Sequence, residues 1–234
     1  MSFVFCKTFI NFFCRIQLKI LWKEGYPLLF MSKIVWKPGA VFAPVPPALI
    51  SCGDLEHPNL MTAAWTGIVN THPPMTYVSI RPQRYSYELI MQNKEFAVNL
   101  TPASLIKAAD FCGVRSGRDL DKWEACGLTP AEASEIATPL VAECPLALEC
   151  RVREIIPLGS HHMFLAEIIA LDVEETLINQ EGSLCLEKAG LAAYAHGKYF
   201  ALGAQLGTFG FSVRKRKKKS KTGKDGNGKY PRKK

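Results

Sequence analysis

The stretch CPLALECRVREIIPLGSHHMFLAEIIALDVEETLI, residues 144–178, contains two long β-compatible runs separated by the short segment Gly-Ser-His-His. Branched and apolar side chains recur through both runs, and a glycine-led segment of this length is typical of the turn in a β-hairpin. The pattern therefore predicts two long antiparallel strands joined by a turn at residues 159–162.

Shorter segments on the amino-terminal side of this hairpin predict further strands. In the segment 75–81, Val78 and Ile80 point to one face, and the alternate residues Tyr77, Ser79 and Arg81 point to the other. Strands are expected at residues 48–53, 59–70, 75–81 and 95–100, the second of them as one long strand.

Helices are expected to be few and short. The sequence predicts one over residues 86–93, with Ser86 as its N-cap, and another over residues 103–112, followed by a polar loop at 113–122. Because strands and helices do not alternate regularly, we expect a mainly β, antiparallel architecture, most simply a barrel. Neither an internal repeat nor a second core of domain size is evident.

The net charge of +8 is distributed unevenly along the 234 residues. Residues 214–234 contain 12 Lys and Arg against one Asp, whereas residues 31–213 contain 13 basic and 19 acidic side chains. The central body therefore lacks the basic face that a nucleic-acid-binding domain needs. We expect residues 214–234 to form a disordered basic tail; non-specific binding of RNA, DNA or acidic lipid through it is the alternative.

The first thirty residues are rich in Phe, Ile and Leu but are interrupted by four Lys and Arg side chains. They match neither a signal peptide, which needs an unbroken apolar segment, nor a membrane span of about 20 apolar residues. Met31 opens a segment that resembles the start of a domain. We therefore expect residues 1–30 to be an extension outside the native domain, and residues 31–213 to form the domain.

The eight cysteines and the paired histidines give no metal-binding pattern. No two cysteines have C-x-x-C spacing, and no histidine accompanies them at metal-ligand spacing. His161 and His162 point in opposite directions on a strand, with no Cys, Asp or Glu within two residues. We expect reduced thiols, a cytoplasmic location and no metal site; one of the two histidines could contact a bound anion or a redox-active ring.

Residues 79–86 combine two arginines and two hydroxyls near the start of an expected helix. Ser79 and Arg81 share a strand face, Arg84 lies in the turn, and the free N–H groups of a helix start carry partial positive charge. Such an arrangement binds phosphate well. The alternative is that the arginines pair with surface carboxylates such as Glu88, and that Ser86 only caps the helix.

The segment NLMTAAWTG, residues 59–67, has little side-chain bulk. Small residues let a flat ring lie close to the backbone, whose N–H and C=O groups can bond the edge of the ring. Trp65 could border such a ring; alternatively, it lies in the core.

Cys112 has no identifiable activating base and is expected to be structural. Dinucleotide fingerprints, P-loops and Ser/His/Asp arrangements are absent from the sequence.

Five segments together resemble the flavin reductase-like, flavoredoxin-type family of FMN-binding split β-barrels. They occur in the family's order within residues 31–217, and they are NLMTAAWTGIVNTHPPMTYVSIRPQRYSYELI (59–90), EFAVNL (95–100), DFCGVRSGRDLDKW (110–123), GSHHMFLAEI (159–168) and GTFGFSVRK (207–215). The resemblance implies an antiparallel Greek-key split barrel with a few short helices, and a homodimer with FMN near its interface.

The resemblance also implies which residues bind FMN. The backbone at Ala63 and Ala64 would contact the edge of the isoalloxazine ring. Ser116 and Lys122 would lie near the ring or the phosphate, and His162, or its neighbour His161, would approach from the hairpin turn. The full implied set is Asn59, Thr62, Ala63, Ala64, Trp65, Ser79, Arg81, Arg84, Tyr85, Ser86, Ser116, Lys122 and His162, of which Ser79, Arg81, Arg84 and Ser86 would take the phosphate.

The implied activity is that of an FMN-dependent oxidoreductase of the NAD(P)H:flavin oxidoreductase type. Electrons or hydride would pass from NAD(P)H or a protein donor through FMN to a flavin or another acceptor. Because the flavin supplies the redox chemistry, no protein residue is assigned as an acid or base. Two alternatives stay open: a flavoredoxin-type electron carrier without NAD(P)H turnover, and a nucleic-acid- or membrane-associated protein acting through its basic tail.

Overall fold

The computed structural model describes residues 33–214. Residues 33–41 form neither helix nor strand and are exposed throughout, and the main compact unit begins at Phe42. The predicted extension (1–30) and all of the predicted tail except Arg214 lie outside the described residues. The proposed boundaries at residues 31 and 213 therefore stay predictions.

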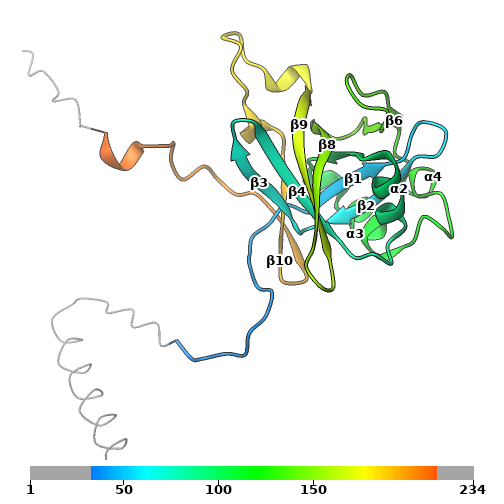
Figure 1. The fold of residues 1–234 in the computed structure, drawn as a ribbon. Helices are drawn as coiled ribbons and strands as arrows, with labels where there is room; N and C mark the ends of the chain where they lie inside the picture. Colours follow the sequence, from blue (N-terminus) through cyan, green and yellow to red (C-terminus); the bar gives the residue numbers. More distant parts are fainter. Residues whose placement is uncertain (1–32, 215–234) are drawn as a thin grey trace, which may run out of the picture. The chain divides into compact units, whose positions relative to one another are not determined.

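A seven-stranded antiparallel sheet forms the centre of the fold, with the strand order β2-β1-β5-β8-β9-β4-β3 (Figure 1). The sheet curls on itself, and short helices lie beside it, so the prediction of a mainly β, antiparallel split barrel is confirmed. Its strands are β1 (Ala48–Cys52), β2 (Asn59–Ala63), β3 (Thr66–Thr71), β4 (Pro74–Ile80), β5 (Glu95–Asn99), β8 (Leu146–Pro157) and β9 (His162–Val173).

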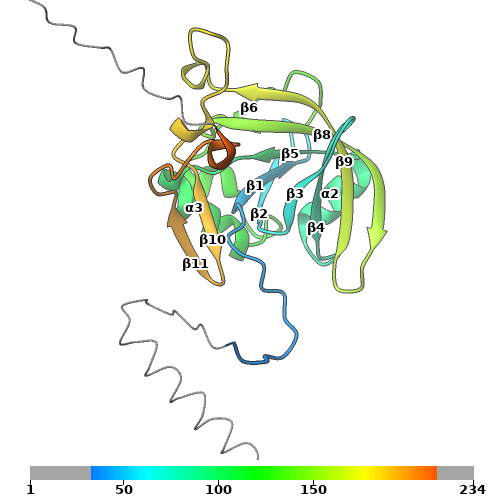
Figure 2. The ribbon, with the colours of Figure 1, turned by 90° about the vertical axis from the view of Figure 1, so that its left-hand side faces the viewer.

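The predicted long hairpin is present as β8 and β9, which pair from Leu146↔Val173 to Pro157↔His162. The pairing contains two register shifts, between Glu149 and Cys150 and between Val152 and Glu154, and such bulges let long strands bend. Strand β5 joins β8 near the open end of this hairpin, and β4 joins β9 near its turn. The two halves of the sheet therefore attach to opposite ends of one hairpin, as the curved strands in Figure 2 show.

The segment 59–70 is not one strand, as the sequence predicted, but two strands broken at Ala64–Trp65. Strand β2 pairs with β1, whereas β3 pairs with β4 at the other edge of the sheet. The short connection between them therefore carries the chain from one edge of the curled sheet to the other. The break leaves backbone at the edge of β2 without a neighbouring strand, and this is where a bound molecule can approach.

Within the described part of the chain, three short α-helices pack beside the sheet: α2 (Tyr85–Asn93), α3 (Ile106–Val114) and α4 (Lys122–Cys126). Ile90 of α2 joins Phe96, Phe164 and neighbouring apolar side chains in the main core. Helices α3 and α4 cover β1 and β2 through a second cluster that contains Leu60, Cys112 and Trp123. This second cluster fixes α3 close to the edge of β2.

A small hairpin near the carboxyl end, β10 (Ala192–Ala195) and β11 (Lys198–Ala201), was not predicted. Its two-residue turn, His196–Gly197, has φ angles of 45° and 85°, the left-handed conformation that tight hairpins require. The remaining short elements are β6 (Pro130–Ala131), β7 (Leu140–Val141) and the 3₁₀ turns η2 (Ala103–Leu105), η3 (Glu175–Leu177), η4 (Leu186–Lys188) and η5 (Phe211–Val213).

Residues 33–214 contain no membrane-spanning helix, no disulfide and no metal-binding cluster. No helix in this part of the chain is long and apolar enough to cross a membrane. All six cysteines within it are free thiols, and within the same range no three His, Cys, Asp or Glu side chains gather closely enough to hold a metal ion.

Candidate functional site

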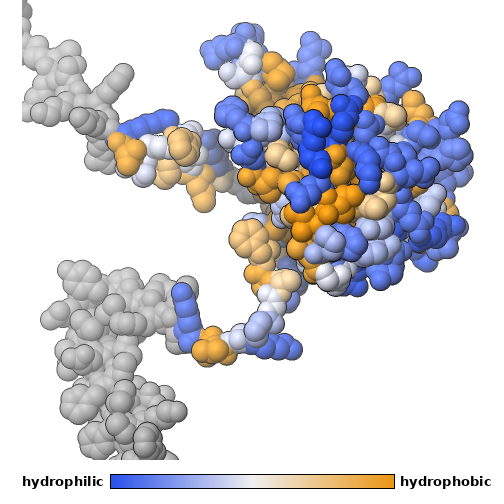
Figure 3. Space-filling view, in the orientation of Figure 1, coloured by the Kyte–Doolittle hydropathy of each residue, from blue (hydrophilic) through white to orange (hydrophobic). Residues whose placement is uncertain are grey.

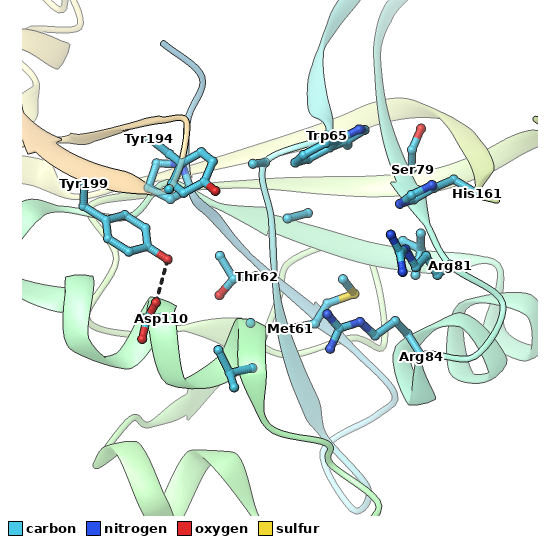
Figure 4. Close-up of a pocket in the computed structure, with 17 residues that line it drawn as sticks. Met61, Thr62, Trp65, Ser79, Arg81, Arg84, Asp110, His161, Tyr194 and Tyr199 are labelled. Atoms are coloured by element: carbon cyan, nitrogen blue, oxygen red, sulfur yellow. Dashed lines mark hydrogen bonds between the residues drawn. The ribbon is translucent and has the colours of Figure 1, made fainter. Parts of the chain in front are cut away.

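A cavity of about 580 Å³ opens beside the connection between β2 and β3. The end of β4, helix α3, the turn of the β8–β9 hairpin and the β10–β11 hairpin complete its walls (Figure 4). Seven of the predicted site residues line it, namely Thr62, Ala63, Ala64, Trp65, Ser79, Arg81 and Arg84.

A smaller cavity of about 130 Å³ lies next to the first and shares Met61, Arg84 and Val114 with it. It contains further predicted residues from the start of α2 and from the segment between α3 and α4. These are Asn59, Tyr85, Ser86, Ser116 and Lys122. The predicted loop at 113–122 is shorter than expected, because α3 extends to Val114 and α4 begins at Lys122.

The two arginines of the predicted phosphate site have no carboxylate partner. Within residues 33–214, neither Arg81 nor Arg84 lies within 4.0 Å of an Asp or Glu oxygen. Glu88, the alternative partner considered from the sequence, instead pairs with Arg118, whose guanidinium also lies 5.3 Å from the centre of the Tyr85 ring. Both predicted arginines are therefore available to an anion.

Lys122 adds a third cation, and this one is buried, with 4% of its surface exposed. Its Nζ donates hydrogen bonds to the carbonyl oxygens of Leu60 (2.6 Å) and Cys112 (3.0 Å), and no carboxylate of residues 33–214 pairs with it. Burial lowers the pKa of Lys122; the Cys112 thiol opposes this effect, and Arg84 adds to it. A buried ammonium without a counter-charge is unfavourable, so an anion in the smaller cavity would stabilise it.

Ser86 is not the N-cap of the helix, in contrast to the sequence-based prediction. Helix α2 begins one residue earlier, at Tyr85, and Arg84 occupies the N-cap position. The buried Ser86 hydroxyl accepts a hydrogen bond of 2.7 Å from Nδ2 of Asn59. Ser86 therefore joins β2 to the start of α2, which places Arg84 at the boundary of the two cavities.

Gly117 closes over this Asn59–Ser86 pair, and we predict that Gly117→Ala destabilises the protein by roughly 1–3 kcal/mol, the usual range for overpacking. A Cβ at Gly117 would lie 1.9 Å from Oδ1 of Asn59, so the buried amide would have to move. Denaturant unfolding measures the change. Gly203→Ala is the control, because its Cβ meets nothing within 4 Å and is expected to change stability by less than about 0.5 kcal/mol. Equal stability of the two variants would contradict the prediction.

The mouth of the larger cavity carries two stacked rings. Trp65 is 46% exposed, and its ring lies parallel to that of His161 with 6.3 Å between the centroids. Trp65 is therefore a wall of the cavity and not a core residue. Burial and the nearby Arg81 guanidinium lower the pKa of His161, which favours the neutral imidazole.

The structure distinguishes the two adjacent histidines. His161 lines the cavity, whereas His162, which the sequence analysis favoured, is not among the lining residues. Nδ1 of His162 instead lies 2.8 Å from the hydroxyl of Tyr87. The two side chains differ because His162 is the first residue of β9, while His161 still belongs to the turn.

Helix α3 is tied to the floor of the cavity. The hydroxyl of Thr62 donates a 2.5 Å hydrogen bond to the carbonyl oxygen of Ala109, and Gly113 faces Thr62 closely. Cys112, on the same helix, lies with its sulfur 3.8 Å from that of Cys126, and burial raises its pKa to about 12. A thiol with so high a pKa is a poor nucleophile, in agreement with the structural role predicted for Cys112.

The cavity wall opposite the arginines was not predicted from the sequence. Tyr194 and Tyr199 project from the β10–β11 hairpin, and Asp110 projects from α3 (Figure 4). The Tyr199 hydroxyl donates a 3.0 Å hydrogen bond to Oδ1 of Asp110, and the two tyrosine rings lie 5.3 Å apart. The His-Gly turn was a usable signal for the hairpin itself. No local pattern, however, brings Tyr199 to a residue 89 positions earlier.

Comparison with known proteins agrees with this geometry. A family model described as the flavin reductase like domain matches residues 42–203. The chain belongs to the flavin reductase like family. That range includes all the residues that line the two cavities.

Two solved flavoredoxin structures are similar to this member of the flavin reductase like family. Flavoredoxin of Desulfovibrio vulgaris (Miyazaki F) is 28% identical, with a TM-score of 0.73, and that of Methanosarcina acetivorans is 29% identical, with a TM-score of 0.69. Each match covers 78% of this chain and 100% of the other. An FMN-binding protein from Thermus thermophilus shares the fold at 24% identity and a TM-score of 0.60, over 74% of this chain and 96% of the other.

Archaeal relatives match part of the sequence. A protein of Archaeoglobus fulgidus is 35% identical over 49% of this chain, and one of Aeropyrum pernix is 33% identical over 56%. The matched parts span 65% and 50% of the lengths of these two relatives.

Proposed function

We propose that this protein binds FMN and transfers electrons or hydride through it, from NAD(P)H or a protein donor to a flavin or another acceptor. One observation carries the proposal. Arg81 and Arg84 line a cavity floored by small residues, the buried Lys122 lines the adjoining cavity that Arg84 shares, and within residues 33–214 none of the three has a carboxylate partner. Such a site fits a flat molecule that carries a doubly charged anion.

The residues present fit the phosphate of FMN. The guanidiniums of Arg81 and Arg84 would donate charge-assisted hydrogen bonds, and the Lys122 ammonium would gain the counter-charge that it lacks. Ser79 supplies a further polar group to the larger cavity, and Ser116 and the start of α2 supply others to the smaller one. Ser86 would contribute indirectly, because its hydroxyl already accepts the hydrogen bond of Asn59.

The flavin ring fits the larger cavity. Ala63 and Ala64 leave their backbone groups accessible at the edge of β2, and Trp65 and His161 border the opening. We assign the histidine contact to His161 in place of His162. When bound, FMN supplies the hydride and electron transfer, while the protein binds it, orients it and limits access of water. No side chain is assigned as an acid or base.

A flavoredoxin-type electron carrier, without NAD(P)H turnover, is the second candidate function. The similarity to two solved flavoredoxins along their full lengths favours it. Both candidates use the same FMN site and differ only in the partner that delivers electrons.

The purified protein tests the proposal directly. We expect yellow material with flavin absorbance, or uptake of added FMN in a calorimeter, and bleaching of the flavin by NADH or NADPH without oxygen. Bleaching by reduced ferredoxin but by neither nucleotide would favour the carrier. Folded protein that is colourless and binds no FMN would refute both candidates.

We also propose a homodimer and a cytoplasmic location. Apolar side chains form patches on the face seen in Figure 3. Ile68 and Val69 of β3 and Leu171 of β9 are exposed. A self-complementary interface would cover such a surface. The free thiols of residues 33–214 fit a reducing compartment. Sedimentation velocity at micromolar concentration tests the dimer.

A further inference from the structure

The two ends of the larger cavity differ in charge. Arg81 and Arg84 line one end, while Asp110, Tyr194 and Tyr199 line the other (Figure 4). The proposed function uses the basic end for phosphate and leaves the acidic, aromatic end without a role.

The Asp110 carboxylate has hydrogen-bond acceptor positions left for a ligand. Within residues 33–214 it has no Lys, Arg or His partner at ion-pair distance, and its described hydrogen bond is the one that Oδ1 accepts from Tyr199. An ionised carboxylate can accept about four hydrogen bonds. Because Thr62 ties α3 to the cavity floor through Ala109, the carboxylate is carried on a fixed helix.

The two tyrosines provide an aromatic wall beside this carboxylate. Their ring centroids are 5.3 Å apart, with planes inclined by 56°, so the pair can present a ring face and a ring edge to a flat ligand. Burial, followed by the contact with Asp110, raises the pKa of Tyr199 to about 12. The hydroxyl therefore keeps its proton and stays a donor to Asp110 at neutral pH.

We propose that Asp110, Tyr194 and Tyr199 form a second binding subsite for a flat aromatic ring that carries N–H donors and is neutral or cationic. The carboxylate accepts hydrogen bonds from such a ring and repels a carboxylate in the same place. The inference rests on the proposed function, because this ring would lie beside bound FMN and would belong to the electron donor or acceptor.

Three ligands of nearly equal shape test the subsite: benzamidine, a cation; benzamide, which is neutral; and benzoate, an anion. Each is titrated into FMN-loaded protein, and the change in flavin absorbance gives Kd. We expect benzamidine to bind about tenfold tighter than benzamide, a factor that corresponds to about 1.4 kcal/mol, and benzoate to bind weakest. FMN already occupies the arginines, so they should not attract benzoate.

Variants of the subsite distinguish the effect of the Asp110 charge on ligand affinity from the effect of the shape of the tyrosine wall. Asp110→Asn is expected to bring the three Kd values within about threefold of one another, whereas Tyr199→Phe, which keeps the ring and the carboxylate, should preserve the order. Glu124→Gln is the control, because it removes an exposed carboxylate that does not line the cavity. If Asp110→Asn does not load with FMN, Tyr194→Leu replaces it and should weaken all three ligands by a similar factor.

The outcomes distinguish this inference from the proposed function. Normal FMN uptake with equal affinity for benzamidine and benzoate, or an unchanged order in Asp110→Asn, overturns the subsite alone. Where Tyr194→Leu is the variant used, unchanged affinities for the three ligands likewise overturn the subsite alone. Failure of the parent protein to take up FMN overturns the proposed function and the subsite with it.

Discussion

The double variant Arg81→Ala, Arg84→Ala is expected to bind FMN about 10²- to 10⁴-fold more weakly than the parent protein. Hydrogen bonds to charged groups contribute roughly 1.5–3 kcal/mol each, and two would be lost. Both side chains are exposed and unpaired with carboxylates in the described part of the chain, so their removal leaves no buried charge behind. We therefore expect the fold to be retained. Calorimetric titration of FMN measures the effect.

Arg118→Ala is the matched control for this loss of charge. Arg118 already pairs with Glu88 on an exposed surface, where an ion pair contributes about 0–1 kcal/mol. We expect its FMN affinity to change by less than about fivefold. Riboflavin, which lacks the phosphate, should bind the parent and the double variant equally. An unchanged FMN dissociation constant in the double variant would remove the phosphate role of the two arginines.

The proposed phosphate-binding segment is recognisable in the sequence because its groups are close together in the chain. Ser79, Arg81 and Arg84 follow one strand and one turn, so local geometry alone brings them together. The β8–β9 hairpin was predictable for the same reason: its pairing is local, and its turn is marked by glycine.

Features that depend on distant contacts were predicted incompletely. The break at Ala64–Trp65 exists because β2 and β3 pair at opposite edges of the sheet, and no pattern within residues 59–70 reveals those partners. The sequence predicts Ser86 as an N-cap because it lies next to the true helix start, yet its hydroxyl accepts a hydrogen bond from Asn59, 27 residues earlier. The wall formed by Asp110 and Tyr199 was missed because it joins a helix to a late hairpin.

The choice between the two histidines also needed the structure. The sequence located the hairpin turn but not the residue at which β9 begins. Because side chains alternate along a strand, a shift of one residue exchanges the side chain that faces the cavity. With β9 beginning at His162, the cavity contact falls to His161.

Lys122→Met is expected to weaken FMN binding by about 10- to 100-fold while changing the stability of the FMN-free protein by less than about 1 kcal/mol. In the free protein, the unfavourable burial of an unpaired ammonium and its two hydrogen bonds to carbonyl oxygens largely offset each other. Methionine fills a similar volume without the charge. In the complex, the phosphate restores the missing counter-charge, so most of the effect should fall on binding.

The pH dependence of FMN binding tests whether the Lys122 ammonium causes this loss of affinity. Burial lowers the pKa of Lys122 in the free protein, whereas a bound phosphate favours the protonated form. FMN binding should therefore take up a proton, and affinity should fall as pH rises through the lowered pKa of Lys122. Lys122→Met should lack this fall, and the matched exposed variant Lys107→Met should keep it. A Lys122→Met protein that binds FMN as the parent does, with the same pH profile, would show that the buried cation has no part in holding the phosphate.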